Sequence, residues 1–125
     1  MKGIFTLLIA ALAFTSLNAQ STLTRTRIVN DRADFFKVML TNTTNVAELT
    51  ELQSILKNER NIIFTWKDLK IGRDGRLSSL TIDIKDKDGF EGSTTLSKFG
   101  DHQGLAFYRD YSPKATIPFW IGEEF

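Results

Sequence analysis

Residues 45–84 read NVAELTELQSILKNERNIIFTWKDLKIGRDGRLSSLTIDI, and this stretch decides the fold. Its first part predicts an amphipathic helix that ends near Glu59, because its apolar residues recur at helical spacing on one face. Asn45 is a suitable N-cap, and the carboxylate of Glu48 can reach back to the amide of the cap. Asn58 or Asn61 can adopt the left-handed conformation that ends a helix. The apolar stripe consists of Val46, Leu49, Leu52, Ile55 and Leu56.

The second part of the stretch predicts a β-hairpin. Residues 62–71 alternate apolar and polar side chains until the pattern slips at Asp68, and a bulge at this point would explain the slip. Asp74-Gly75 is typical of a tight turn, because glycine adopts the positive φ angles that such turns need. Residues 80–84 then alternate again, which indicates a strand with one buried face.

Weaker elements flank this stretch on both sides. Residues 35–41 predict a strand before the helix. Asp88-Gly89 predicts a second turn, and after it come strands over 90–97 and 105–109 and an irregular tail with a short edge strand over 117–121. The apolar stripe of the helix and the apolar face of the sheet must cover each other. We therefore predict an α+β fold, a two-layer sandwich in which one amphipathic helix packs on an antiparallel meander sheet of three to five strands.

The N-terminus has the features of a secretory signal peptide. Lys2 precedes an apolar run over residues 4–14, and small and polar residues lead to Ala19, after which we place the cleavage site. A membrane anchor would need about 20 apolar residues, and no later stretch is long enough to span a bilayer either. A buried N-terminal helix is the other alternative, but apolar residues on every face of the run favour a leader. The predicted organisation is a signal peptide over 1–19, a flexible segment over 20–34, and a single α+β domain over 35–125 with an aromatic C-terminal tail.

The net charge and the cysteine content limit the classes of binding partner and the cellular compartment that we expect for this protein. The chain has 16 Lys and Arg against 15 Asp and Glu, and loss of Lys2 with the leader leaves 15 of each. Nucleic-acid binding usually requires a basic stripe, and charge alone would not bring this domain to an anionic lipid surface. The chain has no cysteine, so it forms no disulfide and no thiolate metal site. A small exported domain without cysteine favours a bacterial periplasm or exterior, so we predict a periplasmic or secreted protein. The sequence does not indicate an oligomeric state.

Residues with catalytic or metal-binding chemistry form no recognisable motif. His102 is the only histidine, whereas a zinc site normally needs three or four ligands. The acidic run over 83–91 suggests a calcium loop, but placing Gly89 at the sixth position puts Ile84 and Thr95 at the first and last ligand positions. A charged hairpin with interleaved lysines is the better interpretation, with a looser calcium site as the alternative. We therefore predict no catalytic residue, no cofactor and no bound metal.

Aromatic residues gather near the C-terminus. Tyr and Trp are favoured at interface hot spots, and strand alternation sends Phe107 and Tyr108 to opposite faces. The alternative is that the tail folds back and completes the core of a small domain. The candidate interaction residues are Tyr108, Tyr111, Phe119 and Trp120.

Five short motifs follow one another in the middle of the chain. They are TTNVAEL at 43–49, LKNE at 56–59, IIFTW at 62–66, GRLSSL at 75–80 and KDKDG at 85–89. This order resembles the small extracytoplasmic domain appended to bacterial membrane zinc metallopeptidases of the beta-lactam-sensor antirepressor type, and free-standing exported proteins of unknown function. The resemblance covers residues 36–96. The chain lacks the His-Glu-x-x-His motif of the peptidase, so no catalytic residue carries over, and the resemblance implies a sensor-side or accessory module.

These observations favour an exported, non-enzymatic binding or interaction module whose partner is an envelope protein or peptide. Its contact surface would be the aromatic tail, the exposed face of the sheet, or an edge strand that pairs with an extended peptide. A small hydrolase or metal-dependent enzyme with an unrecognised site is the alternative function. A structural component of the envelope is a third interpretation.

Overall fold

Seven strands and one helix make up residues 27–124, the part of the chain that the computed structural model describes. The predicted leader over 1–19, the start of the predicted flexible segment and Phe125 lie outside the described residues. In chain order the elements are β1 (Ile28–Asp31), β2 (Phe35–Leu40), α2 (Val46–Arg60), β3 (Ile62–Ile71), β4 (Leu77–Asp86), β5 (Glu91–Leu96), β6 (Gly104–Asp110) and β7 (Phe119–Glu124).

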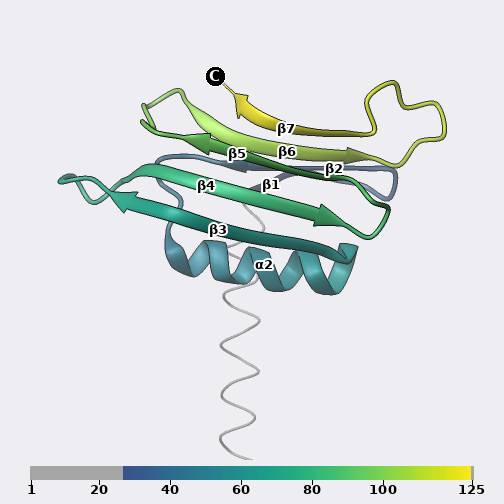
Figure 1. The fold of residues 1–125 in the computed structure, drawn as a ribbon, viewed down its shortest axis with the longest axis horizontal. Coiled ribbons are helices and arrows are strands. Elements are labelled where there is room, and N and C mark those ends of the chain that lie inside the picture. Colours follow the sequence, from purple (N-terminus) through teal and green to yellow (C-terminus); the bar gives the residue numbers. More distant parts are fainter. Residues whose placement is uncertain (1–26, 125) are drawn as a thin grey trace, which may run out of the picture.

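The strands form two antiparallel sheets that face each other across one core (Figure 1). One sheet has the order β1-β2-β6-β7, and the other has the order β3-β4-β5. The predicted α+β class and the packing of one helix on antiparallel strands are confirmed. The single meander of three to five strands is corrected, because the described residues form seven strands in two sheets. Tight turns join β1 to β2, β3 to β4 and β4 to β5. The longer connection over 97–103 leads to β6, which pairs with β2.

Both sheets contribute to the hydrophobic core. The inward side chains of β2, which are Phe36, Val38 and Leu40, are at most 1% exposed. Phe64 on β3 and Phe107 on β6 stack across the two sheets, with ring centroids 6.3 Å apart. Burial of a large apolar side chain stabilises a fold by about 1.5–3 kcal/mol. The contact between the two apolar faces is therefore the main force that holds the sheets together.

Helix α2 lies along β3 and closes the core on that side (Figure 1). Leu49, Leu52 and Leu56 are fully buried, as the apolar stripe predicts. The side-chain amide of Gln53 donates a hydrogen bond of 3.0 Å to the carbonyl of Phe64. This bond satisfies a backbone group on β3, an edge strand that would otherwise present its carbonyls to a foreign strand.

The ends of the helix follow the predicted caps. The side chain of Asn45 accepts a 2.8 Å hydrogen bond from the Glu48 amide, and the Glu48 carboxylate accepts one of 3.2 Å from the Asn45 amide. Asn61 ends the helix with a φ of 55°, and its amide donates to the carbonyl of Leu56. Val46, the first residue of the predicted stripe, is 49% exposed and does not join the core.

The β3–β4 hairpin also agrees with the prediction. The register between the strands shifts between Lys67 and Lys70, and Asp68 has a φ of 56°, which places the bulge at the slip in alternation. Gly75 has a φ of 80° in the turn that follows, and Gly89 has a φ of 91° in the next one. Both glycines occupy the left-handed region where a side chain would be strained.

The two ends of the described chain form strands at the edges of the four-stranded sheet. β1 lies within the segment predicted to be flexible, where Ile28 packs against the core and the strand pairs with β2. β7 lies in the tail, close to the predicted edge strand, and pairs with β6. A Cβ atom on Gly92 of β5 would lie 2.7 Å from Cγ2 of Ile121 and 3.3 Å from Cε2 of Phe119. Gly92 therefore lets β7 pack directly on β5, where the two sheets meet.

Within residues 27–124, no helix has the length and apolar character needed to cross a membrane.

Candidate functional site

Three aromatic rings form a row on the outward face of the four-stranded sheet. Tyr108 on β6 stacks on Phe35 of β2, with centroids 5.3 Å apart, and on Trp120 of β7, with centroids 6.0 Å apart. Tyr108 lies opposite Lys37 on one side and opposite Trp120 on the other, and side chains in register share a face. The neighbouring side chain of Phe107 points into the core, so Tyr108 points outward. We call Phe35, Tyr108 and Trp120 the aromatic row.

An ion pair crosses the same face beside the row. Nζ of Lys37 lies 2.7 Å from Oε1 of Glu124, so the pair spans β6, which separates β2 from β7. Beneath the pair, β6 carries the small residue Ala106, whose neighbour in register on β7 is Gly122. Oε2 of Glu124 is buried and has no hydrogen-bond partner among residues 27–124. Only one of the two carboxylate oxygens of Glu124 therefore has a partner among these residues.

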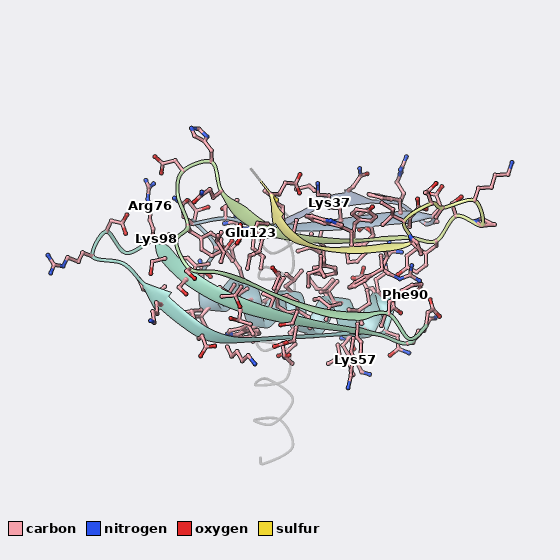
Figure 2. The ribbon with its side chains drawn as sticks, turned by 45° about the horizontal axis from the view of Figure 1, so that its top comes forward. Lys37, Lys57, Arg76, Phe90, Lys98 and Glu123 are labelled. Atoms are coloured by element: carbon pink, nitrogen blue, oxygen red, sulfur yellow. The ribbon has the colours of Figure 1, made fainter. Side chains whose placement is uncertain are left out.

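Tyr108 and Trp120 of the row and the two residues of the ion pair line a shallow depression of about 470 Å³, together with Ile117 and Glu123. Ile117 is 52% exposed. The indole of Trp120 lies close to the strand, because a Cβ atom on Gly122 would be only 3.0 Å from its Cζ2 atom. In Figure 2, Lys37 and Glu123 mark this sheet, and Lys57 of α2 lies on the opposite side of the view. Aromatic side chains, an exposed aliphatic residue and charges of both signs are the components of a protein contact site.

A larger depression of about 640 Å³ lies on the outward face of the three-stranded sheet. Ile63, which is 48% exposed, is its most prominent apolar residue. Lys85 and Glu91 form an ion pair of 3.9 Å there, with both side chains largely in solvent. No aromatic residue lines the described part of this depression. A partner would find fewer rigid anchors here than at the aromatic row.

A buried arginine joins the two sheets at one end of the molecule. Arg109 on β6 is 4% exposed and forms an ion pair with Asp86 at the end of β4. Its Nη2 atom lies 2.8 Å from Oδ2 of Asp88, and its Nη1 atom donates a 2.7 Å hydrogen bond to the carbonyl of Pro118. Burial alone would lower the pKa of Arg109, but its hydrogen bonds to Asp86 and Asp88 outweigh burial and raise that pKa. Arg109 therefore stays charged in its buried position.

Two aromatic rings enclose this guanidinium. The Cζ atom of Arg109 lies 4.5 Å from the ring centre of Phe90 and 4.4 Å from that of Tyr111. Figure 2 places Phe90 at the end of the molecule opposite Arg76 and Lys98. Burial of Tyr111, and then the charge of Asp86, raise the pKa of its phenol above the ordinary value. The polar groups of Arg109 are all paired within the chain, so we interpret this cluster as part of the structure of the fold and not as a binding or catalytic site.

The structure separates the four predicted contact residues into two pairs. Tyr108 and Trp120 come together in the aromatic row. Phe119 packs against the core and stacks on Phe90, with centroids 6.0 Å apart, and Tyr111 lies beside Arg109. The tail therefore completes the core with one set of side chains and presents another set on the outward face, which combines the two alternatives that the sequence left open.

The other candidate residues are explained by their surroundings. His102 is exposed in the turn that precedes β6. Asp86 and Asp88 of the acidic hairpin both pair with Arg109, so these carboxylates have a cationic partner within the chain. Among residues 27–124, no group of three or more His, Cys, Asp or Glu could hold a metal ion.

Sequence reasoning missed three residues of the outward face, which are Phe35, Lys37 and Glu124. Phe35 carried a usable signal, because it precedes the buried Phe36 in a strand and alternation sends the two to opposite faces. Lys37 and Glu124 are 87 residues apart in the chain, and no local pattern connects them. Their pairing follows only from the order β2-β6-β7.

Comparisons with known proteins add no relative. No family model matches the chain, and neither a curated protein nor a solved structure matches it. The resemblance of residues 36–96 to an extracytoplasmic sensor-associated domain therefore stays a prediction.

Proposed function

We propose that the chain is an exported, non-enzymatic binding module of the bacterial envelope, which contacts a polypeptide partner through the aromatic row. The observation that carries the proposal is the stacking of Phe35, Tyr108 and Trp120 across three adjacent strands on an outward face. Rigid aromatic side chains give large contact area at a low cost in conformational entropy, which is why they dominate interface hot spots. The sequence resemblance to a sensor-associated domain supports the same class of function.

The edges of the two sheets are less suitable for binding a partner than this outward face is. Gln53 covers part of the β3 edge, and β5 and β7 pack on each other at Gly92. β1 is the remaining edge among the described strands, but it is four residues long and its register shifts between Ile28 and Asn30. Short and bulged edge strands are poor templates for strand addition. Recognition through side chains of the outward face therefore fits this fold better than recruitment of an extended peptide.

Site-specific photocrosslinking tests the proposal without removing any ring of the row. A photoreactive phenylalanine analogue replaces Ile117, which is 52% exposed and lines the depression, or replaces Ile63, which is 48% exposed on the other sheet. The full chain is expressed and exported in the cells that produce it naturally, and the adducts are identified by mass spectrometry. We expect one polypeptide to crosslink from position 117 and not from position 63.

A second variant links the adduct to the row itself. Trp120→Ala in the background of the crosslinker at position 117 should reduce the yield of that adduct at least tenfold, while circular dichroism shows an unchanged fold. Equal crosslinking from both positions, or an adduct whose yield does not depend on Trp120, would exclude the aromatic row as the contact surface.

A further inference from the structure

The outward face that carries the aromatic row is small. The three strands under the row have six or seven residues each, so their outward face measures about 20 Å by about 15 Å. A stable contact between two globular proteins buries about 800 Å² on each partner, which is more than twice this area. The face therefore suits a short segment of a polypeptide better than a folded partner or a second copy of this chain.

The rings of the row follow one another across the strands. The ring planes of Phe35 and Tyr108 differ by 29°, and those of Tyr108 and Trp120 differ by 18°. The three residues stand on the adjacent strands β2, β6 and β7, and the central strand β6 already pairs with a strand on each side. A segment that contacts all three rings therefore crosses the strands and contacts side chains, without backbone pairing to the sheet.

The accessible polar groups beside the row include several hydrogen-bond donors. The hydroxyl of Tyr108 and the indole N–H of Trp120 form no hydrogen bond within residues 27–124, and neither atom is buried. Lys37 uses one of the three donors of its ammonium group in its bond to Glu124. Because Lys37 and Glu124 compensate each other's charge, a ligand of this part of the face needs acceptors but no net charge.

The carboxylates of the same face are less accessible to a ligand. Oε1 of Glu124 is paired with Lys37, and its Oε2 is buried. Oδ1 of Asp110, which is in register with Phe35, accepts a 3.0 Å hydrogen bond from the amide of Ser112. An extended segment of ordinary composition would bring N–H groups that lose water here, and a buried donor without an acceptor is costly. A segment with few N–H groups fits this face better.

We infer that the row binds a proline-rich segment of the partner in the polyproline II conformation. Proline has no backbone N–H, and the carbonyls of a polyproline II helix are free because this helix has no internal hydrogen bonds. Such a segment brings acceptors to the donors of Tyr108, Trp120 and Lys37, and its pyrrolidine rings pack on the aromatic rings. This inference rests on the proposed function and names the class of segment that the row recognises.

The length of the row agrees with such a ligand. The ring centroids of Phe35 and Tyr108 are 5.3 Å apart, and those of Tyr108 and Trp120 are 6.0 Å apart. A polyproline II helix rises about 3.1 Å per residue, so about four residues reach from one end of the row to the other. The helix is largely formed before it binds, so little conformational entropy is lost on a small contact area.

Binding of a hexaproline peptide with a fluorescein label tests the inference. Fluorescence anisotropy follows the titration of the labelled peptide with the full chain after export, and a glycine-serine hexapeptide with the same label is the control ligand. We expect saturable binding of hexaproline and binding at least tenfold weaker for the control. Added salt should change the affinity little, because the ligand has no charged backbone or side-chain group.

Substitutions in the row separate ring contact from hydrogen bonding. Trp120→Ala should weaken hexaproline binding at least tenfold, because it removes a ring and a donor. Trp120→Phe and Tyr108→Phe keep a ring and remove only a donor, so each should weaken binding several-fold. Ile63→Ala, on the outward face of the other sheet, is the matched control and should have no effect. Circular dichroism checks that each variant keeps its fold.

Several outcomes would overturn the inference. Equal affinity for the two peptides, or hexaproline binding that does not depend on Trp120, would show that the row does not recognise proline. Tighter binding of a hexapeptide of alternating valine and threonine would indicate strand pairing, and binding of maltohexaose alone would indicate a glycan site. Crosslinking from position 117 that depends on Trp120, without any binding of hexaproline, would refute the inference and leave the proposed function intact. Loss of both results would refute both.

Discussion

Arg109 and Asp86 form a buried ion pair between the two sheets, with side chains that are 4% and 1% exposed. The arginine stands on β6 of one sheet, and the aspartate ends β4 of the other. Apolar contacts hold the sheets together but have little directional preference. A buried ion pair has a demanding geometry, and this one links β6 of one sheet to the end of β4 in the other.

Removal of one partner of this pair should be strongly destabilising. Asp86→Ala leaves the buried guanidinium of Arg109 with only Asp88 as a carboxylate partner, and such uncompensated burial costs about 3–5 kcal/mol of unfolding free energy. Urea denaturation followed by circular dichroism measures the loss. The matched control is Lys85→Ala, which removes an exposed ion pair and should cost less than about 1 kcal/mol.

A double substitution separates the charge effect from packing. Asp86→Leu combined with Arg109→Met replaces the pair by apolar side chains, and such replacements are often neutral or stabilising. The double variant should therefore be more stable than Asp86→Ala. A double variant as unstable as the single one would show that Asp88 and Pro118, the other hydrogen-bond partners of Arg109, dominate the contribution of this cluster.

The parts of the fold that could be predicted are those whose signals are local. The capping box of Asn45 and Glu48 lies within four residues, and Asp74-Gly75 specifies its turn directly. Alternation also placed Phe107 and Tyr108 on opposite faces. Within these stretches the backbone conformation depends on neighbouring residues alone, so no tertiary information was needed.

The pairing of strands that are distant in the chain could not be predicted from local sequence signals. β2 and β6 each have an apolar face that would suit several partners, and Leu40 lies 65 positions before Leu105, its partner in the sheet. Arg109 resembles an exposed strand residue in the sequence, and only the approach of β4 buries it. The aromatic row depends on the same order of strands, because only the pairing of β2 with β6 brings Phe35 beside Tyr108.

Loss of the helix cap should have a moderate effect. Asn45→Ala removes the side-chain acceptor for the Glu48 amide, and substitutions of this kind cost about 0.5–2 kcal/mol. Asn45→Asp retains an acceptor at the same position and should keep most of the stability. Equal destabilisation of both variants in urea denaturation would contradict a capping role for Asn45.

The contact between β5 and β7 at Gly92 should not tolerate a methyl group. Gly92→Ala would place Cβ 2.7 Å from Cγ2 of Ile121, so side chains or strands must shift, and overpacking of this kind costs about 1–3 kcal/mol. Ser93→Ala, on the next residue of the same strand, is the control and should change stability by less than about 0.5 kcal/mol.

A double-mutant cycle identifies the cause of the Gly92 effect. Ile121→Ala removes the atom that the new methyl group meets, so Gly92→Ala should cost less in that background than in the original chain. Additive effects of the two substitutions would mean that β7 does not pack on Gly92 as described.

Tyr111 should make stability depend on pH in the alkaline range. Burial and the charge of Asp86 raise the pKa of this phenol above its ordinary value of about 10, which is also its value in the unfolded chain. Between the two pKa values the folded state binds more protons than the unfolded state, so the unfolding free energy falls as pH rises. Below pH of about 10 the phenol is protonated in both states and its full contribution is present.

The comparison with Tyr111→Phe isolates this contribution from the titration of lysines. We expect unfolding free energy, measured in urea between about pH 9 and 11, to fall more steeply in the original chain than in the variant. In Tyr108→Phe, which retains Tyr111 as the only tyrosine, the absorbance of tyrosinate should develop above the ordinary pKa of about 10. If that absorbance develops below the ordinary value, the nearby guanidinium groups of Arg60 and Arg109 outweigh burial, and the slope of stability against pH would be the reverse of that expected here.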